Sequence, residues 1–167
     1  LNRYLVAARC PDHDAGLAAL PFYLHLRAAI RAKVTAARAG LVSGADRDAA
    51  LAEASRYLAF ATRALAPPPP RLVAIGGLSG TGKSALAAAL APRLGGPAGA
   101  VTVRSDVERK LLAGASETKR LPPAAYTADA TAQVFARVAG RAATLLGAGM
   151  AVICDAVYPQ PAHRAAI

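Results

Sequence analysis

Eight residues directly after a short apolar run have the types and spacing needed to bind a chain of phosphates. They read Gly-Leu-Ser-Gly-Thr-Gly-Lys-Ser over 77–84, and the apolar run covers 72–75. Glycine backbones adopt positive φ easily and approach a ligand closely because no Cβ intervenes. Successive main-chain N–H groups can then face an anion, helped by the positive end of the following helix. The pattern predicts a phosphate-binding turn between a buried strand and a helix.

Within this turn, two side chains have further expected roles. Lys83 would bridge the β- and γ-phosphates of ATP, and the hydroxyl of Ser84 would hold Mg²⁺. The competing interpretation is a structural strand-to-helix turn in a chain rich in glycine and alanine. We expect the nucleotide contacts to come from the whole run: Gly77, Leu78, Ser79, Gly80, Thr81, Gly82, Lys83 and Ser84.

Asp106 and Arg109 are the next candidates for chemistry. Asp106 follows an apolar stretch that we expect to form the second strand, about 100–104. A carboxylate at that strand end could accept the proton of an attacking hydroxyl group. Arg109 lies one helical turn further on, so it would share a face with Asp106 and could hold an anionic group of the acceptor. The alternative is an Asp that caps a helix, next to a solvated Arg.

Asp155 ends a third apolar run, 151–154. Four apolar residues followed by an acid are typical of the second strand of a nucleotide site, whose carboxylate orients Mg²⁺ or its water. The alternative is a strand-terminal Asp that makes a turn. Together with Ser84, Asp155 is our candidate metal ligand.

Some polar residues near these positions have weaker signals. Lys119, Arg120 and Tyr126 lie in or beside a polar loop and could line an acceptor pocket, although a solvated basic loop is the simpler interpretation. Tyr158 and His163 follow the third strand, where we expect packing or surface roles.

Strands separated by helices must position these residues from residue 71 onward. We expect strands at about 72–76, 100–104 and 150–154, with helices at about 83–94, 106–113 and 128–146. This alternation predicts a parallel sheet with right-handed crossovers, and ligands of such sheets bind at the carboxyl ends of the strands. The glycine-rich turn, Asp106 and Asp155 all fall at those ends, which favours a single active site.

Residues 1–66 show a different periodicity, that of helices. Apolar residues recur every three or four positions from Tyr23 to Ala37 and again from Leu51 to Leu65, and the short turn between the two stripes predicts an antiparallel helical hairpin. Four prolines at 67–70 would end the second helix and form a linker. A hairpin alone buries little surface, so we expect it to dock on another part of the protein.

The composition favours a cytoplasmic enzyme. The 167 residues carry a net charge of +10, but the basic residues are spread along the chain, so nucleic-acid binding is a secondary interpretation. Cys10, Cys154 and the three histidines lack metal-ligand spacing. Arg137 and Arg141 interrupt the longest candidate for a membrane span. Because the sequence begins with Leu and stops in an expected helix, we expect a fragment of a longer protein.

The motifs from residue 71 to 167 resemble the P-loop kinase group that includes gluconate kinase, chloramphenicol phosphotransferase, zeta toxins and the kinase domain of polynucleotide kinase. The similarity rests on 77–84, on Arg-Ser-Asp-Val-Glu-Arg at 104–109 and on Val-Ile-Cys-Asp-Ala at 152–156. It implies a three-layer αβα P-loop NTPase fold with a parallel sheet, C-terminally truncated and preceded by an α-helical segment. The domains would be 1–66 (helical), 67–70 (linker) and 71–167 (incomplete kinase).

A second resemblance is to bacterial fusions in which an aminoglycoside-phosphotransferase-like domain precedes an ATP-binding domain. It rests on 76–84, on Ser-Asp-Val-Glu-Arg-Lys at 105–110 and on Arg-Leu-Pro-Pro-Ala-Ala-Tyr at 120–126. The helical segment, including 23–33, is similar to the last helices of the first domain of such fusions. The arginine-bearing lid of the kinase group would lie beyond Ile167, so the fragment alone is expected to be inactive.

The sequence therefore predicts a kinase that uses ATP and Mg²⁺ to phosphorylate a hydroxyl group of a small molecule. Lys83, Asp106 and Arg109 would be its catalytic residues. Two alternatives stay open: a 5′-hydroxyl polynucleotide kinase, and a regulatory nucleotide-binding ATPase. The acceptor, the oligomeric state and the activity of an upstream domain are not encoded in any motif.

Overall fold

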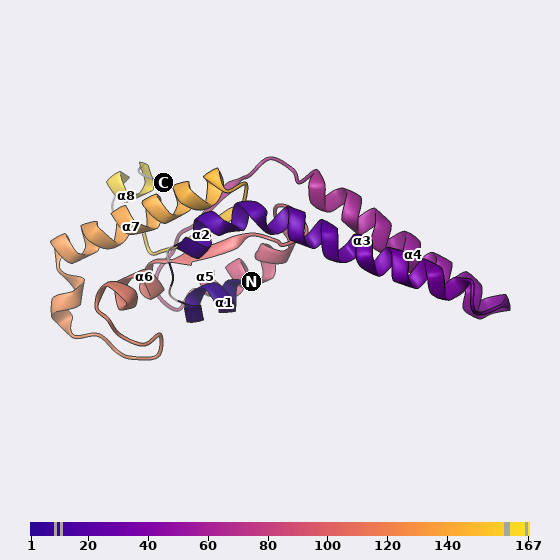
Figure 1. Cartoon of the computed structure of the whole chain (residues 1–167). Coiled ribbons are helices and arrows are strands. Elements are labelled where there is room, and N and C mark those ends of the chain that lie inside the picture. The colour runs from indigo at the N-terminus through magenta and orange to yellow at the C-terminus, as the bar shows by residue number, and fades with distance from the viewer. Residues whose placement is uncertain (9, 11, 159–160, 166) are drawn as a thin grey trace. The chain divides into compact units, whose positions relative to one another are not determined.

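Short apolar runs and longer amphipathic segments alternate through most of the chain, and each forms the type of element that its period favours. The computed structural model describes residues 1–8, 10, 12–158, 161–165 and 167. Figure 1 shows the ribbon. The elements, in order, are α1 (Asn2–Ala8), α2 (Asp12–Gly16), η1 (Leu17–Ala19), α3 (Leu20–Ala39), α4 (Gly44–Leu65), β1 (Leu72–Ile75), α5 (Lys83–Leu90), η2 (Ala91–Arg93), β2 (Val101–Arg104), α6 (Ser105–Leu112), η3 (Pro123–Tyr126), α7 (Ala128–Gly147), β3 (Val152–Asp155) and α8 (Pro161–Ala165).

The chain divides into two compact units. The α/β unit contains residues 1–18, 69–95 and 99–167, and the second unit contains 19–68 and 96–98. The expected helical segment 1–66 is thus divided at residue 18. A physical reason is that the first residues are bound to the α/β unit: the side chain of Asn2 donates to the carbonyl of Ala100 and accepts from the amide of Thr102, as a neighbouring strand would.

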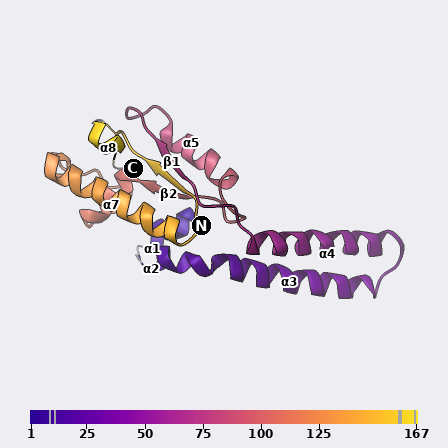
Figure 2. The ribbon, with the colours of Figure 1, turned by 90° about the horizontal axis from the view of Figure 1, so that it is seen from above.

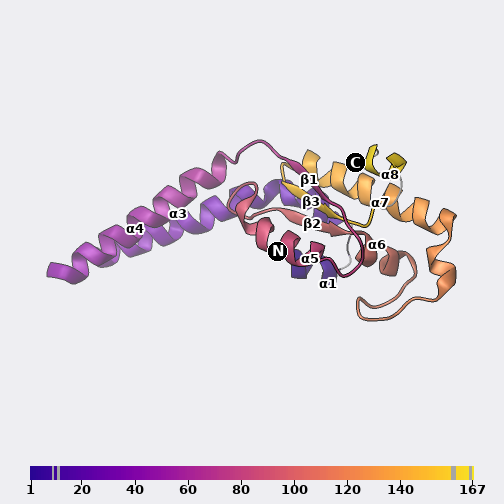
Figure 3. The same ribbon diagram turned by 180° about the vertical axis from the view of Figure 1, so that it is seen from behind.

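The sheet of the α/β unit has three parallel strands in the order β1-β3-β2 (Figure 3). All four residues of β3 are buried, as expected of a central strand with helices on both faces. In Figure 2, α5 and α7 lie on opposite sides of the strands, which confirms an α/β fold with a parallel sheet.

The core of this unit consists of two layers. On one side, Ala87 of α5 and Ala91 of η2 pack against Ile75 and Ile153. The buried face of α7 follows a helical period; it consists of Val134, Val138, Ala142 and Leu145. Thr127 caps α7, because its hydroxyl accepts a hydrogen bond from the amide of Ala130.

The expected helix at 83–94 is shorter in the structure. α5 ends at Leu90, and 91–93 form a tighter 3₁₀ turn. Pro92 explains this ending, because it has no N–H group to continue the helical hydrogen bonds.

The second unit contains the predicted hairpin, formed by α3 and α4 (Leu20–Leu65; hereafter the helical hairpin), whose helices run side by side. The sequence identified the helices but not the face that they bury. Leu26, Ile30 and Leu58 are exposed, whereas the contact between the helices is made of small residues. The buried residues are Ala28, Ala32, Thr35 and Ala39 in α3 and Ala50, Ala54, Ala61 and Ala64 in α4.

Among the described residues, no helix is both long and apolar enough to cross a membrane.

Candidate functional site

The glycine-rich turn forms a compact loop between β1 and α5. Gly77 and Gly82 have φ values of 151° and 84°, and Gly82 immediately precedes the helix. The hydroxyl of Thr81 donates to the carbonyl oxygen of Leu78 over 2.8 Å, which closes the turn from within. A loop of this shape brings main-chain N–H groups together at the positive end of α5, where an anion is favoured.

Lys83 lies across this loop. Its Nζ donates to the carbonyl oxygen of Leu78 over 2.6 Å. The ammonium group is thereby held over the turn instead of extending into solvent. A phosphate that entered the loop would meet a positive charge as well as the main-chain amides.

The strand register places the ends of all three strands in one row. Asp155 is aligned with Ile75 of β1 and with Arg104 of β2. The chain continues from Ile75 into the glycine-rich turn and from Arg104 into α6. The residues that the sequence predicted at strand ends therefore meet at the same edge of the sheet.

Ser84 and Asp155 are in direct contact. The Ser84 hydroxyl donates to Oδ2 of Asp155 over 2.5 Å, and Asp155 is only 5% exposed. The guanidinium of Arg104 approaches the same carboxylate, with Nε 3.7 Å from Oδ2. Its Nη1 lies 3.2 Å from Oε1 of Glu117. Arg104 thus adds a second positive charge beside the loop.

The pair of Ser84 and Asp155 fits a magnesium ion better than it fits a metal ion whose ligands all come from the protein. Mg²⁺ prefers oxygen ligands and keeps several waters or phosphate oxygens in its coordination shell, so one hydroxyl and one carboxylate can suffice. In the part of the chain that the structure describes, no group of three or more His, Cys, Asp or Glu side chains could hold a metal ion.

Asp106 lies in the first turn of α6, which begins at Ser105, and is therefore not the N-cap of that helix. Its side chain is 51% exposed, and Oδ2 forms an ion pair with Nζ of Lys110 at 2.9 Å. The same Nζ donates to the carbonyl oxygen of Glu117 over 2.6 Å. Lys110 thus connects Asp106 to the loop that follows α6.

Arg109 is held more firmly than the sequence indicated. Nη1 donates to the carbonyl oxygen of Ala125 over 2.6 Å, and Nη2 reaches the hydroxyl of Thr131 at 3.4 Å. The guanidinium carbon also lies 4.9 Å from the ring centre of Tyr126, a cation–π contact. This arginine organises the wall of the site and presents Tyr126.

One cavity of about 730 Å³ collects these groups, which is a typical size for a small-molecule site. Residues from all three predicted strand ends border it, although Gly77, Leu78 and Thr81 of the loop do not belong to its lining. Its lining consists of Ser79, Gly80, Gly82, Lys83, Ser84, Ala85, Arg104, Ser105, Asp106, Arg109, Tyr126, Asp155, Ala156 and Val157.

Of the residues with weaker sequence signals, Tyr126 lines the cavity, whereas the other four do not belong to its lining. Lys119 and Arg120 are exposed loop residues. Tyr158 is buried with its ring 5.5 Å from that of Phe135, and the His163 ring stacks on Phe135 at 4.1 Å. Burial raises the pKa of Tyr158, and the neighbouring acidic groups of Cys154 and Asp155 add to the increase. These contacts agree with the predicted packing role.

Arg104 and Lys110 are site residues to which the sequence reasoning gave no role. Both belong to the stretch that drew attention to Asp106, and Arg104 is the last residue of its strand. The sequence shows that Arg104 and Asp155 both lie at the ends of expected strands. Only the strand register shows that the two residues are partners.

Comparison with known proteins agrees with this geometry. The family model described as an AAA domain (AAA_33) matches residues 72–167. The chain belongs to this AAA domain family. The match begins at the first residue of β1 and includes the glycine-rich turn, Asp106 and Asp155. The AAA domain is thus a nucleotide-binding domain of the P-loop type, in a family related to kinases and ATPases.

Similar proteins occur in mycobacteria. The uncharacterized protein Rv2004c of Mycobacterium tuberculosis and the uncharacterized protein Mb2027c of Mycobacterium bovis are each 34% identical over 149 residues, which is 86% of this chain. The chain spans 28% of the length of these relatives. No solved structure matches the chain.

Proposed function

We propose that the AAA domain is a kinase that transfers the γ-phosphoryl group of ATP to a hydroxyl group of a small-molecule acceptor. One observation carries this proposal: the phosphate loop, Asp106 and Asp155 come from three different strand ends and border one cavity. Nucleotide binding alone requires the loop. A second carboxylate on the wall of the same cavity is what a phosphoryl transfer to a hydroxyl group requires in addition.

In this reaction the acceptor oxygen attacks the γ-phosphorus, and the bond between that phosphorus and the β,γ-bridging oxygen breaks. ADP leaves with the electron pair of that bond. The carboxylate of Asp106 accepts the proton of the acceptor hydroxyl. Lys110 holds that carboxylate at the wall of the cavity through the 2.9 Å ion pair.

The loop and its neighbouring cations supply positive charge. Main-chain amides of 77–84 and the ammonium of Lys83 would hold the phosphates, and Arg104 adds charge near Asp155. Ser84 and Asp155 would hold Mg²⁺, which neutralises charge that develops on the β- and γ-phosphate oxygens. Arg109 and Tyr126 would border the acceptor. A need for ATP fits a cytoplasmic place of action.

Transfer of labelled phosphate from ATP tests the role of Asp106. The full-length protein would be incubated with sugars, nucleosides, aminoglycosides and oligonucleotides, and each active acceptor would be repeated with Asp106→Asn. Loss of the proton acceptor should lower transfer by roughly 10²- to 10⁴-fold while the affinity for ATP is kept. Asp129→Asn is the matched control, because Asp129 is also an exposed acid in the first turn of a helix, α7.

Transfer by Asp106→Asn at the wild-type rate would remove Asp106 from the proposal. ATP hydrolysis that no acceptor changes would contradict the kinase assignment and favour a regulatory ATPase.

A further inference from the structure

A buried charge cluster lies on the side of α6 away from the proposed site. Glu108 is 0% exposed, although it is a carboxylate between Asp106 and Arg109 in sequence. Its two oxygens accept hydrogen bonds from Nε of Arg137 at 2.6 Å and from Nη1 of Arg141 at 2.7 Å. A buried carboxylate is tolerated only with such pairing, because desolvation of an unpaired charge is very unfavourable.

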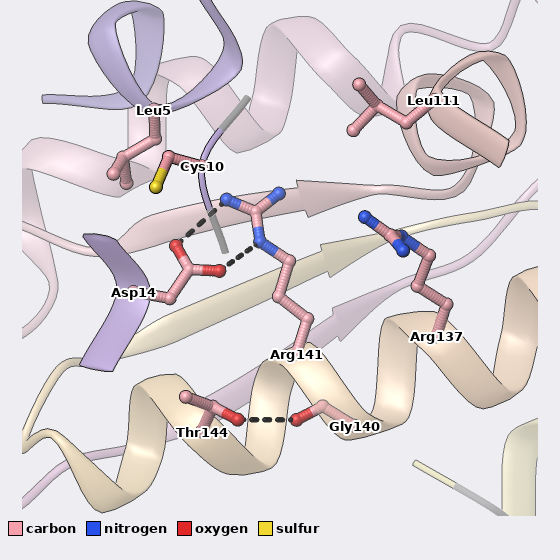
Figure 4. A pocket seen from close by; sticks show the side chains of 8 residues that line it. All are labelled: Leu5, Cys10, Asp14, Leu111, Arg137, Gly140, Arg141 and Thr144. Atoms are coloured by element: carbon pink, nitrogen blue, oxygen red, sulfur yellow. Dashed lines mark hydrogen bonds and ion pairs between the residues drawn. The ribbon is translucent and has the colours of Figure 1, made fainter. Parts of the chain in front are cut away.

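The cluster continues into the first residues of the chain. Nε and Nη2 of Arg141 donate to both carboxylate oxygens of Asp14, at 2.6 and 3.1 Å. Figure 4 shows this fork between Asp14 and Arg141, with Arg137 extending from the same face of α7. Asp14 is itself buried. We call Asp14, Glu108, Arg137 and Arg141 the clamp.

The clamp is electrically balanced, with two carboxylates and two guanidinium groups. Burial opposes the charge of Arg141, but the hydrogen bonds and charges of Asp14 and Glu108 together outweigh it and raise the pKa of Arg141. Arg141 is thus shared between two acids that lie in different segments, α2 and α6. Loss of either acid leaves Arg141 with a single carboxylate partner and gives the cluster an excess positive charge.

The position of Glu108 determines where the other residues of α6 point. Each residue of an α-helix is rotated by about 100° from the previous one, so Asp106 lies about 200° from Glu108 around the axis. With Glu108 fixed against α7, Asp106 faces the opposite side, where the proposed site lies. The orientation of the proposed base therefore depends on the contacts of a neighbour that never touches the site.

On the proposed function, we infer that Asp14, Glu108 and Arg141 are positioning residues for Asp106. They hold α6 in the rotation that places the Asp106 carboxylate on the cavity wall. The first residues of the chain then serve the AAA domain directly, although they lie outside the residues that the family model matches.

Asp14→Asn in the full-length protein is the most informative variant, because it preserves the shape of the side chain and removes only the negative charge of Asp14. Asp12→Asn is its matched control: Asp12 belongs to the same short helix and is exposed. Turnover of ATP, alone or with an acceptor, should fall by about tenfold in Asp14→Asn with an unchanged KM for ATP, as expected when a catalytic group is misplaced. Asp12→Asn should behave as wild type.

A double-mutant cycle separates positioning from general destabilisation. In the Asp106→Asn background, Asp14→Asn should cause no further loss, because the group that it positions is absent. A further tenfold loss there, or an increase of KM equal to the fall in turnover, would overturn the inference.

Hydrogen exchange tests the clamp independently of catalysis. Amides of α6 should exchange about tenfold faster in Asp14→Asn than in Asp12→Asn, while those of α5 stay unchanged. Equal exchange of α6 in the two variants would overturn the clamp. Wild-type protein that neither hydrolyses ATP nor transfers its phosphate would instead refute the proposed function, and exchange would still decide whether the clamp holds α6.

Discussion

The α/β unit and the helical hairpin have different interiors. Leu145, Val138 and Ile153 are fully buried in the α/β unit. The hairpin buries alanines at its helix contact and exposes most of its leucines, with Leu58 60% exposed. The comparison shows that apolar periodicity predicts a helix in both units, but it predicts the buried face only where a large partner such as a sheet covers that face.

The two units also differ in the chemistry of their charged residues. In the α/β unit, cations meet carboxylates at the cavity and in the clamp. The hairpin groove is bordered by Arg27, Arg31, Arg56 and Arg63 with Glu53 as its acid. We therefore expect nucleotide affinity to depend on the α/β unit and to be insensitive to the hairpin.

The largest expected effect is that of Lys83→Ala on nucleotide affinity. Removal of the ammonium that lies over the loop should weaken ATP·Mg²⁺ binding by at least about 100-fold, because a charge-assisted contact to the phosphates is lost. Isothermal titration calorimetry measures this change. Arg56→Ala in the hairpin is the control, and an equal loss in both variants would mean that the two units do not differ as proposed.

A pair of leucine truncations tests the difference between the two interiors. Leu145→Ala should lower the free energy of unfolding by about 2–5 kcal/mol, since it leaves a cavity in a fully buried site. Leu58→Ala should change it by less than about 1 kcal/mol in the 167-residue chain, since that side chain is already solvated. Urea denaturation of both variants checks this. Equal losses would show that the hairpin leucines are buried.

Much of the α/β unit could be predicted from the sequence because its signals are local. The strands expected at about 72–76 and 150–154 are observed at 72–75 and 152–155, and Thr127 caps α7. The pattern at 77–84 requires glycines at fixed positions, and the structure has positive φ at Gly77 and Gly82. Such features depend on neighbouring residues only, so the sequence contains them.

Features that depend on distant residues could not be predicted. Glu108 looks like a solvated helix residue, yet it binds Arg141, which is 33 positions away. Tyr23 and Leu26 suggested a buried stripe, but which face of α3 is covered depends on the partner helix and not on α3 alone. Arg109 was expected to hold an anionic group of the acceptor, and the sequence did not indicate that its Nη1 donates to the loop carbonyl of Ala125.

A smaller effect is expected from Asp155→Asn on magnesium. Loss of the charge beside Ser84 should weaken Mg²⁺ binding in the nucleotide complex by about 10- to 100-fold. Titration of Mg²⁺ into the protein with ATP measures this. Asp46→Asn, in the first turn of α4, is the control in the hairpin. Magnesium dependence equal to that of wild type would remove Asp155 from the metal site.

The smallest expected effect concerns Cys154 in β3. Burial raises the pKa of its thiol to about 11, so the reactive thiolate is scarce at pH 8–9. Because the thiol has a higher pKa in the folded state than in the unfolded state, the unfolded state loses its proton first as the pH rises. The free energy of unfolding should therefore fall as the pH rises from about 9 toward 11. Iodoacetamide at pH 8.5 should label Cys10 before Cys154. Rapid labelling of native Cys154 would contradict a tightly packed central strand.

The most direct test of the account is a structure of the chain with a non-hydrolysable ATP analogue and Mg²⁺. We predict that the phosphates lie in the loop 77–84, with Lys83 on the β- and γ-phosphates and the terminal phosphate facing Asp106. A nucleotide bound elsewhere, or phosphates that make no contact with the amides of the loop or with Lys83, would contradict the central claim that this loop binds the triphosphate.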